Sequence, residues 1–365
     1  MADGGATQFK ASDLIRLGLQ DLDRARTDLD RLDRIGLDPH IKQTAIGSLE
    51  SACDPDAALS SLVMVLDQYT SNGLPDFLQE GNDRDGSAIK SLIRVLGASE
   101  AMGRLMRSRP SLVEAVACDP CRSGDCPLQT RKALISDALS QASMGLPGQE
   151  VLARQVDTLR AQYRLQLAAI MARDLAAEEP EKVQPDISQA LSDLAEATLE
   201  GALAIAEGQV PSSDRCRFTV IGMGKLGARE LNYVSDVDLI YVVEPAGEVS
   251  DHDLTSIGTK IAILLQKICQ SIIPGTLEPP LWKVDTALRP EGKDGPLVRR
   301  LEAHADYYRS WAESWEFQAL LKARPVAGDV ELGSAYAEMA REFVWKASQR
   351  RNFVYDCQAM RARVE

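Results

Sequence analysis

The first 210 residues alternate between amphipathic helical patterns and polar interruptions. Apolar residues recur at three- and four-residue spacing in four segments, which predicts a helix in each: 11–32, 57–69, 87–106 and 130–143. Longer patterns cover 149–177 and 186–206, and Asp186 after Pro185 predicts an N-cap for the second of these. Gly-, Pro- and Asp-rich interruptions lie at 73–75, 119–121, 124–127 and 145–148. We expect this region to be helical throughout.

The pattern changes at residues 211–214. Short β-branched runs bounded by turn residues predict buried strands at 217–221 and 239–243, and alternation predicts a third strand at 281–288. Residues 253–273 have a helical pattern between the second and third strands.

From residue 301 the pattern is helical again, and it places Trp311 and Trp315 on one helix face. The fold class is therefore α+β. We expect a helical region at 1–210, a small mixed β-sheet core at 211–300 and a helical segment at 301–365. Residues 360–365 stop within a helical pattern without a Gly or Pro terminator, so we expect a fragment of a longer protein.

Composition excludes some classes of protein. The net charge of -13 argues against binding to a nucleic-acid backbone. No run approaches the ~20 apolar residues that cross a bilayer, and the first residues lack the blocks of a signal peptide. Seven cysteines without an export signal predict reduced thiols and a cytoplasmic protein. The cluster of Cys118, Cys121 and Cys126 lacks a nearby fourth ligand for zinc, so we expect a plain loop there.

A glycine turn and two carboxylates lie between the first two strands. Gly222, Gly224 and Gly227 follow the first strand and leave backbone room for a phosphate, with Lys225 as a nearby positive charge. Asp236 and Asp238 open the second strand, where their spacing sends both to one face. Two carboxylates so placed repel each other unless a cation lies between them. The combination indicates a site for a metal ion and a nucleotide.

Two familiar phosphate-binding motifs fit this segment less well. A P-loop needs Ser or Thr where Leu226 stands. The glycines do spell the dinucleotide-binding pattern, with Glu244 about 20 residues on. However, that fold binds ligands at the carboxyl ends of parallel strands, whereas the aspartates open theirs, and residues 225–235 are short for a crossover helix.

An antiparallel turn accounts for more of the sequence. It brings the start of the second strand beside the glycine turn, and Asp285, among apolar neighbours in the third strand, can then join Asp236 and Asp238. A buried carboxylate costs several kcal/mol unless a cation compensates it. We therefore predict two Mg²⁺ ions held by the three aspartates, an arrangement that serves in-line phosphoryl displacement.

The order of motifs resembles a known family. Glycine turn, Asp-x-Asp and a later lone Asp resemble the DNA polymerase β-like nucleotidyltransferase superfamily. More specifically, six ordered motifs resemble glutamine synthetase adenylyltransferase: Gly222-Met-Gly-Lys-Leu-Gly, Glu230-Leu-Asn232, Ser235-Asp-Val-Asp-Leu239, Asp285-Thr-Ala-Leu-Arg-Pro290, Gly295-Pro-Leu-Val298 and Trp315-Glu-(x)5-Lys-Ala-Arg324.

The resemblance implies a function. The family's enzymes carry two nucleotidyltransferase units in tandem, and this chain has one unit after a helical region, like the N-terminal half. That half removes AMP from a tyrosine of glutamine synthetase by phosphorolysis, giving ADP. The implied ligands are ATP or ADP and phosphate, and a nitrogen-regulatory PII-type protein is a further expected partner. AMP transfer from ATP, and a nucleotide-sensing module without turnover, remain alternatives.

The remaining candidate residues are assigned to phosphate or nucleotide binding. Ser235 precedes the Asp pair, and Arg289 is expected near the end of the third strand, where it holds phosphate or pairs with Glu291 or a metal-binding carboxylate. The resemblance directs Lys322 and Arg324 at the nucleotide. The alternative is favourable charge at the end of the helix that contains Trp315.

Overall fold

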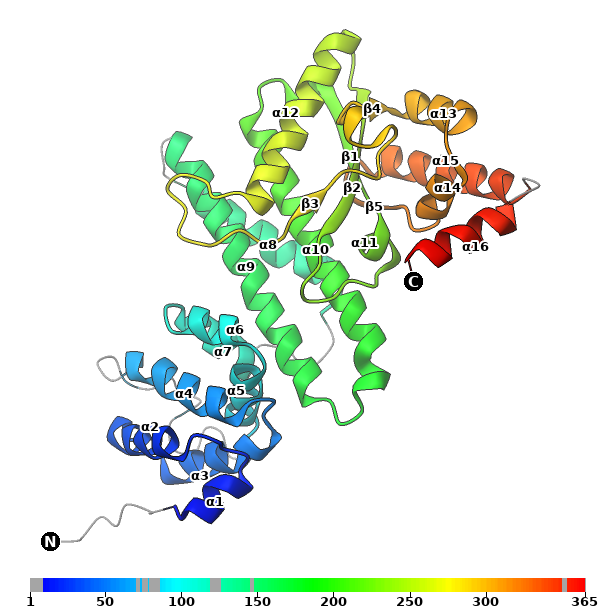
Figure 1. Ribbon diagram of the computed structural model, residues 1–365. Coiled ribbons are helices and arrows are strands. Elements are labelled where there is room, and N and C mark those ends of the chain that lie inside the picture. Colours follow the sequence, from blue (N-terminus) through cyan, green and yellow to red (C-terminus); the bar gives the residue numbers. More distant parts are fainter. Residues whose placement is uncertain are drawn as a thin grey trace, which may run out of the picture. The chain divides into compact units, whose positions relative to one another are not determined.

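The computed structural model describes residues 9–69, 73, 78, 86–118, 126–144, 148–349 and 353–364. They form two compact units, one of Met1–Cys126 with Arg164–Ile187 and one of Pro127–Tyr163 with Ser188–Glu365. Figure 1 shows both units as ribbons. Cys121 and most of the predicted interruptions at 73–75, 119–121, 124–127 and 145–148 lie outside the described residues.

The first unit is helical, as predicted. Its helices are α1 (Ala11–Arg16), α2 (Leu22–Ile35), α3 (Pro39–Ser48), α4 (Pro55–Leu66), α5 (Ser87–Ala98), α6 (Glu100–Met106) and α7 (Pro110–Cys118), with parts of α9 (Gly148–Ala176) and α10 (Pro180–Gln209). Their apolar faces meet in one core that includes Leu32, Leu62 and Leu92. The buried stripes recur at helical spacing, which is why each segment folds as a helix only against its neighbours.

Several predicted helix limits were wrong. Residues 11–32 form two helices because Gly18 takes a left-handed φ of 85° between them. Residues 87–106 are also divided, because the Ser99 side chain accepts a hydrogen bond from Met102 N and starts α6. The helix predicted to start at Asp186 begins at Pro180 and has Pro185 in its interior.

The second unit is built on a small mixed sheet, which confirms the α+β class. The strands are β1 (Cys216–Gly222), β2 (Val237–Pro245), β3 (Val284–Asp285), β4 (Val298–Arg300) and β5 (Arg324–Gly328). The sheet order is β3-β2-β1-β5, and β4 also pairs with β2. β1 is antiparallel to β2 and to β5, whereas β3 and β4 run parallel to β2.

Helices pack against the sheet on both sides (Figure 1). α12 (Asp251–Gln270) contacts β1, β2 and β4, and Gly258 of α12 faces Val243. The alternate residues Ile240 and Val242 belong to a second apolar cluster. That cluster involves α13 (Leu301–Ser310), α14 (Ser314–Leu320), α15 (Val330–Ser348) and α16 (Phe353–Val364). The unit also contains α8 (Leu128–Ala142). Residues of β2 thus alternate between two apolar layers, as expected for a strand buried on both faces.

The C-terminal part of the sheet differs from the sequence prediction. Only Val284–Asp285 of the predicted strand at 281–288 pairs with a neighbour. The strands β4 and β5 were missed, and because β5 lies within 301–365, that segment is not wholly helical. Trp311 and Trp315 do not share a helix, since α13 ends at Ser310 and Trp315 belongs to α14. The predicted three-part division at 210 and 300 stays a prediction.

Two further expectations concern cysteines and membranes. The prediction that all thiols are reduced is wrong for Cys126, which is disulfide-bonded, whereas Cys53, Cys216 and Cys269 are free. Cysteine counting cannot tell which sulfur atoms come within bonding distance. Among the described residues, none of the helices combines the length and apolarity required for a membrane span.

An ion pair ties β1 to the start of α15. Arg217 Nε and Nη2 donate to the Asp329 carboxylate at 2.8 Å each, and Asp329 also caps α15. The hydrogen bond from Arg217 lowers the pKa of Asp329 to about 2. Because its folded-state pKa is depressed, this carboxylate contributes stability above its unfolded pKa of about 3.9, and that stability is lost as the pH falls towards 2.

Asp329→Asn should therefore destabilise the second unit by about 2 kcal/mol at pH 7, because Asn can still cap the helix but cannot pair with Arg217. Urea denaturation of both proteins at pH 7 and pH 3 measures this difference. It should shrink at pH 3; an equal difference at both values would contradict the ionic origin.

Candidate nucleotidyl-transfer site

The glycine turn and the aspartate pair meet at one end of the β1–β2 hairpin. Gly222 pairs with Leu239, and Met223 N donates to Asp238 O at 2.8 Å. The chain then forms the short helix α11 (Gly224–Ala228). This confirms the predicted antiparallel turn and excludes a crossover helix between parallel strands.

Gly224 lies directly against the carboxylate of Asp238. A Cβ on Gly224 would stand 2.3 Å from Asp238 Oδ2, and its φ of 53° is in the left-handed region. Only glycine fits both constraints without displacement. The turn and the carboxylate are therefore two parts of one local structure.

Gly222 and Gly227 are packed so closely against other segments that neither has room for a Cβ atom. A Cβ on Gly227 would lie 1.8 Å from Lys322 O, and one on Gly222 would lie 2.8 Å from Val326 Cγ1. These two glycines allow the segment entering β5 to approach α11 and β1 closely. Their direct contact with phosphate stays a prediction.

Asp285 is brought beside Asp238 by the sheet. β3 pairs in parallel with β2 in a register that sets Asp238 opposite Asp285. The short strand is fixed by Val237 N donating to Lys283 O at 3.0 Å and by Gln270 Oε1 accepting from Val284 N at 2.9 Å. Burial raises the pKa of Asp238, and the negative charges of Asp285 and Asp236 raise it further, while Lys225 lowers it.

The three aspartates differ in their present partners. Asp236 is exposed just before β2, and its Oδ2 lies 3.4 Å from Lys283 Nζ. Asp285 Oδ1 accepts from Ala287 N at 2.7 Å. In the part of the chain that the structure describes, these side chains do not form a ready-made group of three metal ligands.

The donor set nevertheless fits a hard cation. All three groups are carboxylates, the ligands that Mg²⁺ prefers, and each of the other two raises the pKa of Asp238 by its charge. A divalent ion would relieve this repulsion. Holding it requires Asp236 to exchange its exposed contact with Lys283, which costs little because surface ion pairs are weak.

Lys225 and Ser235 flank the aspartates. Lys225 is exposed on α11 and acts on Asp238 through its charge. The Ser235 hydroxyl donates to Asp236 O at 2.9 Å. Both positions agree with a role near phosphate, which stays a prediction.

The Arg289 side chain hydrogen-bonds within its own loop. Its guanidinium donates to the backbone carbonyls of Thr286, Lys293 and Gly295 at 2.7–3.2 Å. The expected pairing with Glu291 was wrong, because this arginine closes the turn after β3. The charge of Asp285 acts on Arg289, and contact of Arg289 with phosphate stays a prediction. Glu291 instead pairs with Arg299.

Lys322 and Arg324 do not end a helix, contrary to the prediction. α14 stops at Leu320, and Arg324 is the first residue of β5. Lys322 Nζ lies 2.8 Å from Glu230 Oε2 on the exposed surface. Arg324 donates to Leu226 O and Gly227 O and pairs with Glu196. Nucleotide contact by either residue stays a prediction.

Comparison with known proteins shows the family of this chain. A family model described as glutamate-ammonia ligase adenylyltransferase matches residues 89–339. The chain belongs to this family. The matched residues include the glycine turn, all three aspartates and β5.

Curated adenylyltransferase relatives cover nearly all of the chain. A "bifunctional glutamine synthetase adenylyltransferase/adenylyl-removing enzyme" of Bifidobacterium longum is 52% identical over 98% of this chain and 34% of its own length. Relatives of the same name from Cutibacterium acnes and Streptomyces coelicolor are 40% and 38% identical, over 96% of this chain and 35% and 33% of their lengths. The chain thus spans about a third of the length of these relatives.

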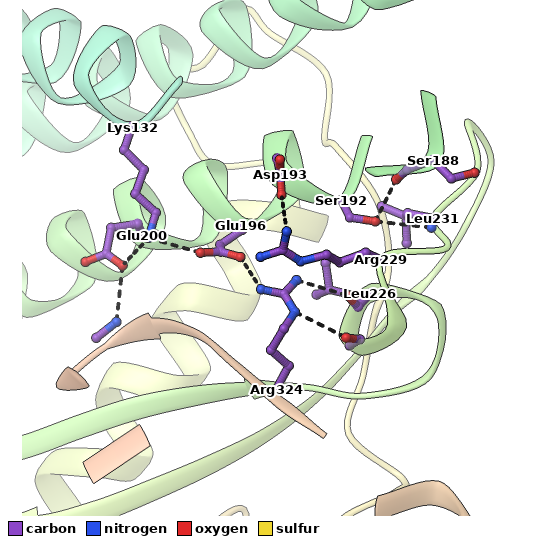
Figure 2. A network of polar contacts seen from close by, with 12 residues as sticks. Lys132, Ser188, Ser192, Asp193, Glu196, Glu200, Leu226, Arg229, Leu231 and Arg324 are labelled. Carbon is purple, nitrogen blue, oxygen red and sulfur yellow. Dashed lines mark hydrogen bonds and ion pairs between the residues drawn. The ribbon is translucent and has the colours of Figure 1, made fainter. Parts of the chain in front are cut away.

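A polar row on α10 beside the candidate site was not predicted from the sequence. Its members contact the glycine segment or β5: Ser192, Asp193, Glu196 and Glu200. Figure 2 shows these side chains directed at Leu231, Arg229, Arg324 and a backbone nitrogen. Polar residues at helical spacing within an Ala- and Leu-rich helix were the available signal.

Proposed function

We propose that this chain is a Mg²⁺-dependent nucleotidyltransferase unit that removes AMP from an adenylylated tyrosine of glutamine synthetase by phosphorolysis, releasing ADP. The observation that carries the proposal is the contact of Gly224 with the Asp238 carboxylate, whose partner across β2 and β3 is Asp285. A glycine turn beside two crowded carboxylates suits nucleotidyl transfer, in which backbone groups bind phosphate and carboxylates bind metal ions.

Each side chain of the site has its own role in the proposal. Asp236, Asp238 and Asp285 would hold the Mg²⁺ ions, expected to be two. When bound, the ions supply charge neutralisation and hold the reacting phosphoryl oxygens in line. The glycine turn positions the phosphates, and Lys225 adds positive charge beside them.

Phosphorolysis suits this set of groups. Inorganic phosphate is already anionic at neutral pH, so the attack needs positioning and charge neutralisation and no strong general base. AMP transfer to tyrosine would require a hydroxyl of pKa about 10 to lose its proton. The resemblance of the chain to the N-terminal half of the family's two-unit enzymes also favours removal.

The expected partners follow from the proposal. Glutamine synthetase is the protein substrate, as in the names of the relatives, and ADP, ATP and phosphate are the small ligands. A PII-type protein is the proposed signal of nitrogen status, and the cytoplasm is the proposed compartment.

The test is a phosphorolysis assay. Adenylylated glutamine synthetase incubated with the chain, phosphate and Mg²⁺ should release ADP, and chelation of Mg²⁺ by EDTA should abolish the release. Omission of phosphate is the matched control. AMP incorporation from ATP into the unmodified substrate, without ADP release from the adenylylated one, would establish the opposite direction. Neither reaction from a folded protein would refute the proposal.

A further inference from the structure

Helix α10 supports the glycine turn through a buried ion pair. The Glu196 side chain is only 7% exposed and pairs with Arg324 Nη1. The same arginine donates from Nε to Gly227 O at 3.2 Å and from Nη2 to Leu226 O at 3.1 Å. One guanidinium therefore links α10 to the last turn of α11 (Figure 2).

The other end of α11 touches the aspartate site. The helix has five residues, so it is about 7.5 Å long at 1.5 Å per residue. Its first residue, Gly224, lies against Asp238 Oδ2, and its last turn is held by Arg324. A displacement of the last turn would thus move the first residue relative to the carboxylate.

Further contacts from α10 restrain the same segment. Ser192 Oγ accepts from Leu231 N at 3.2 Å, and Asp193 Oδ1 lies 3.9 Å from Arg229 Nη1. Arg229 ends α11 with a left-handed φ of 61°, a conformation that the surrounding contacts must hold for a residue other than glycine.

Lys132 of α8 completes the charge balance. Its Nζ lies 3.2 Å from Glu196 Oε1 and 3.7 Å from Glu200 Oε2. Glu200 Oε2 also accepts from Gly328 N at the end of β5. Two cations and two carboxylates therefore fix both ends of β5 against α10. These additional partners matter because a buried ion pair without them can be destabilising.

We propose that Glu196 and Arg324 are positioning residues, whose ion pair holds α11 so that the glycine turn keeps its place against Asp238 during nucleotidyl transfer. The proposal rests on the proposed function and changes the role of Arg324. Its contacts are with protein carbonyls and a carboxylate, so it acts on the phosphate-binding turn through α11.

Two variants test the pair. Glu196→Gln keeps the shape of the side chain and removes its charge, and Arg324→Lys keeps the charge and removes the planar fork that reaches two carbonyls. Asp329→Asn is the matched control, because it breaks an ion pair of the same unit that joins β1 to α15.

Hydrogen exchange provides a measurement independent of turnover. The amides to follow are Gly227 N, Arg229 N and Glu230 N, which donate within and just after α11 at 3.0, 3.2 and 2.8 Å. Their exchange should be at least about tenfold faster in both variants than in Asp329→Asn, which corrects for a general loss of stability of the same unit. Unchanged exchange in Glu196→Gln and Arg324→Lys would overturn the proposal.

Kinetics tests the catalytic consequence. Both variants, assayed well below their unfolding temperature, should lose about 10- to 100-fold in kcat, with the KM for the adenylylated protein unchanged, since small displacements of catalytic groups cost this much. Faster exchange with an unchanged kcat would reduce the pair to a purely structural role and overturn the proposal. Absence of turnover in the unsubstituted chain would count against the proposed function, and exchange would still decide whether the pair holds the turn.

Discussion

Asp238→Asn should lower kcat for ADP release by about 10³-fold or more, because loss of a metal-binding carboxylate removes several kcal/mol of charge stabilisation. The variant should nevertheless be at least as stable as the unsubstituted chain when no metal is present. The pKa of Asp238 is raised by burial and by Asp285 and Asp236, so its ionised form opposes folding. Stability associated with this group is present below its unfolded pKa and is lost as the pH rises through the folded value.

Single-turnover kinetics and urea denaturation in EDTA measure the two effects. Asp214→Asn is the control, since this exposed residue precedes β1 at the opposite end of the same hairpin. It should leave kcat unchanged. Retention of more than a tenth of the turnover by Asp238→Asn, or marked destabilisation without metal, would contradict the assignment.

Gly227→Ala should destabilise the second unit by about 3 kcal/mol or more, the upper range for overpacking. Its added methyl would stand 1.8 Å from Lys322 O and 2.5 Å from Gly222 O, and both are backbone atoms that cannot rotate away. Relief requires movement of β5 or of α11, so the glycine turn should also lose its place beside Asp238.

Gly208→Ala is the matched control in the same unit. Gly208 is exposed in α10, and a Cβ there meets nothing within 4 Å. Removing a helical glycine should stabilise by about 0.5–1 kcal/mol. Urea denaturation compares the two variants. If Gly227→Ala unfolded within about 0.5 kcal/mol of the unsubstituted chain, the close approach of Lys322 to α11 would be disproved.

The centre of the site could be predicted because its signals are local. Strands β1 and β2 are short apolar runs joined by one turn, so their pairing follows from residues close in sequence. The turn then fixes Asp238 beside Gly224. The position of Asp285 required a second inference, that a carboxylate in an apolar strand needs a charged group or a cation nearby. The parallel register of β3, which sets Asp285 opposite Asp238, agrees with this inference.

The surroundings of the site could not be predicted in the same way. β5 pairs with β1 about a hundred residues earlier, and nothing local to Arg324 specifies that partner. We therefore predicted a helical segment that continued through β5. The role of Arg324 was equally hidden, because its partners are Glu196 and two carbonyls that become adjacent only in the fold.

Trp311 and Arg289 illustrate the limits of spacing arguments. Trp311 stands four residues before Trp315, yet it lies beyond the end of α13 and is 79% exposed. Arg289 satisfies the carbonyls of a turn, which is a frequent role of a half-buried guanidinium and which spacing did not indicate. Its contact with phosphate stays a prediction.

The central claim is that Asp236, Asp238 and Asp285 form one metal site beside the glycine turn. Titration with Mn²⁺, followed by electron paramagnetic resonance in the presence of ADP, tests it without any turnover. The account predicts that the unsubstituted chain binds the metal and that Asp238→Asn and Asp285→Asn each weaken binding at least about tenfold, whereas Asp214→Asn does not. Equal Mn²⁺ affinity in all four proteins would contradict it.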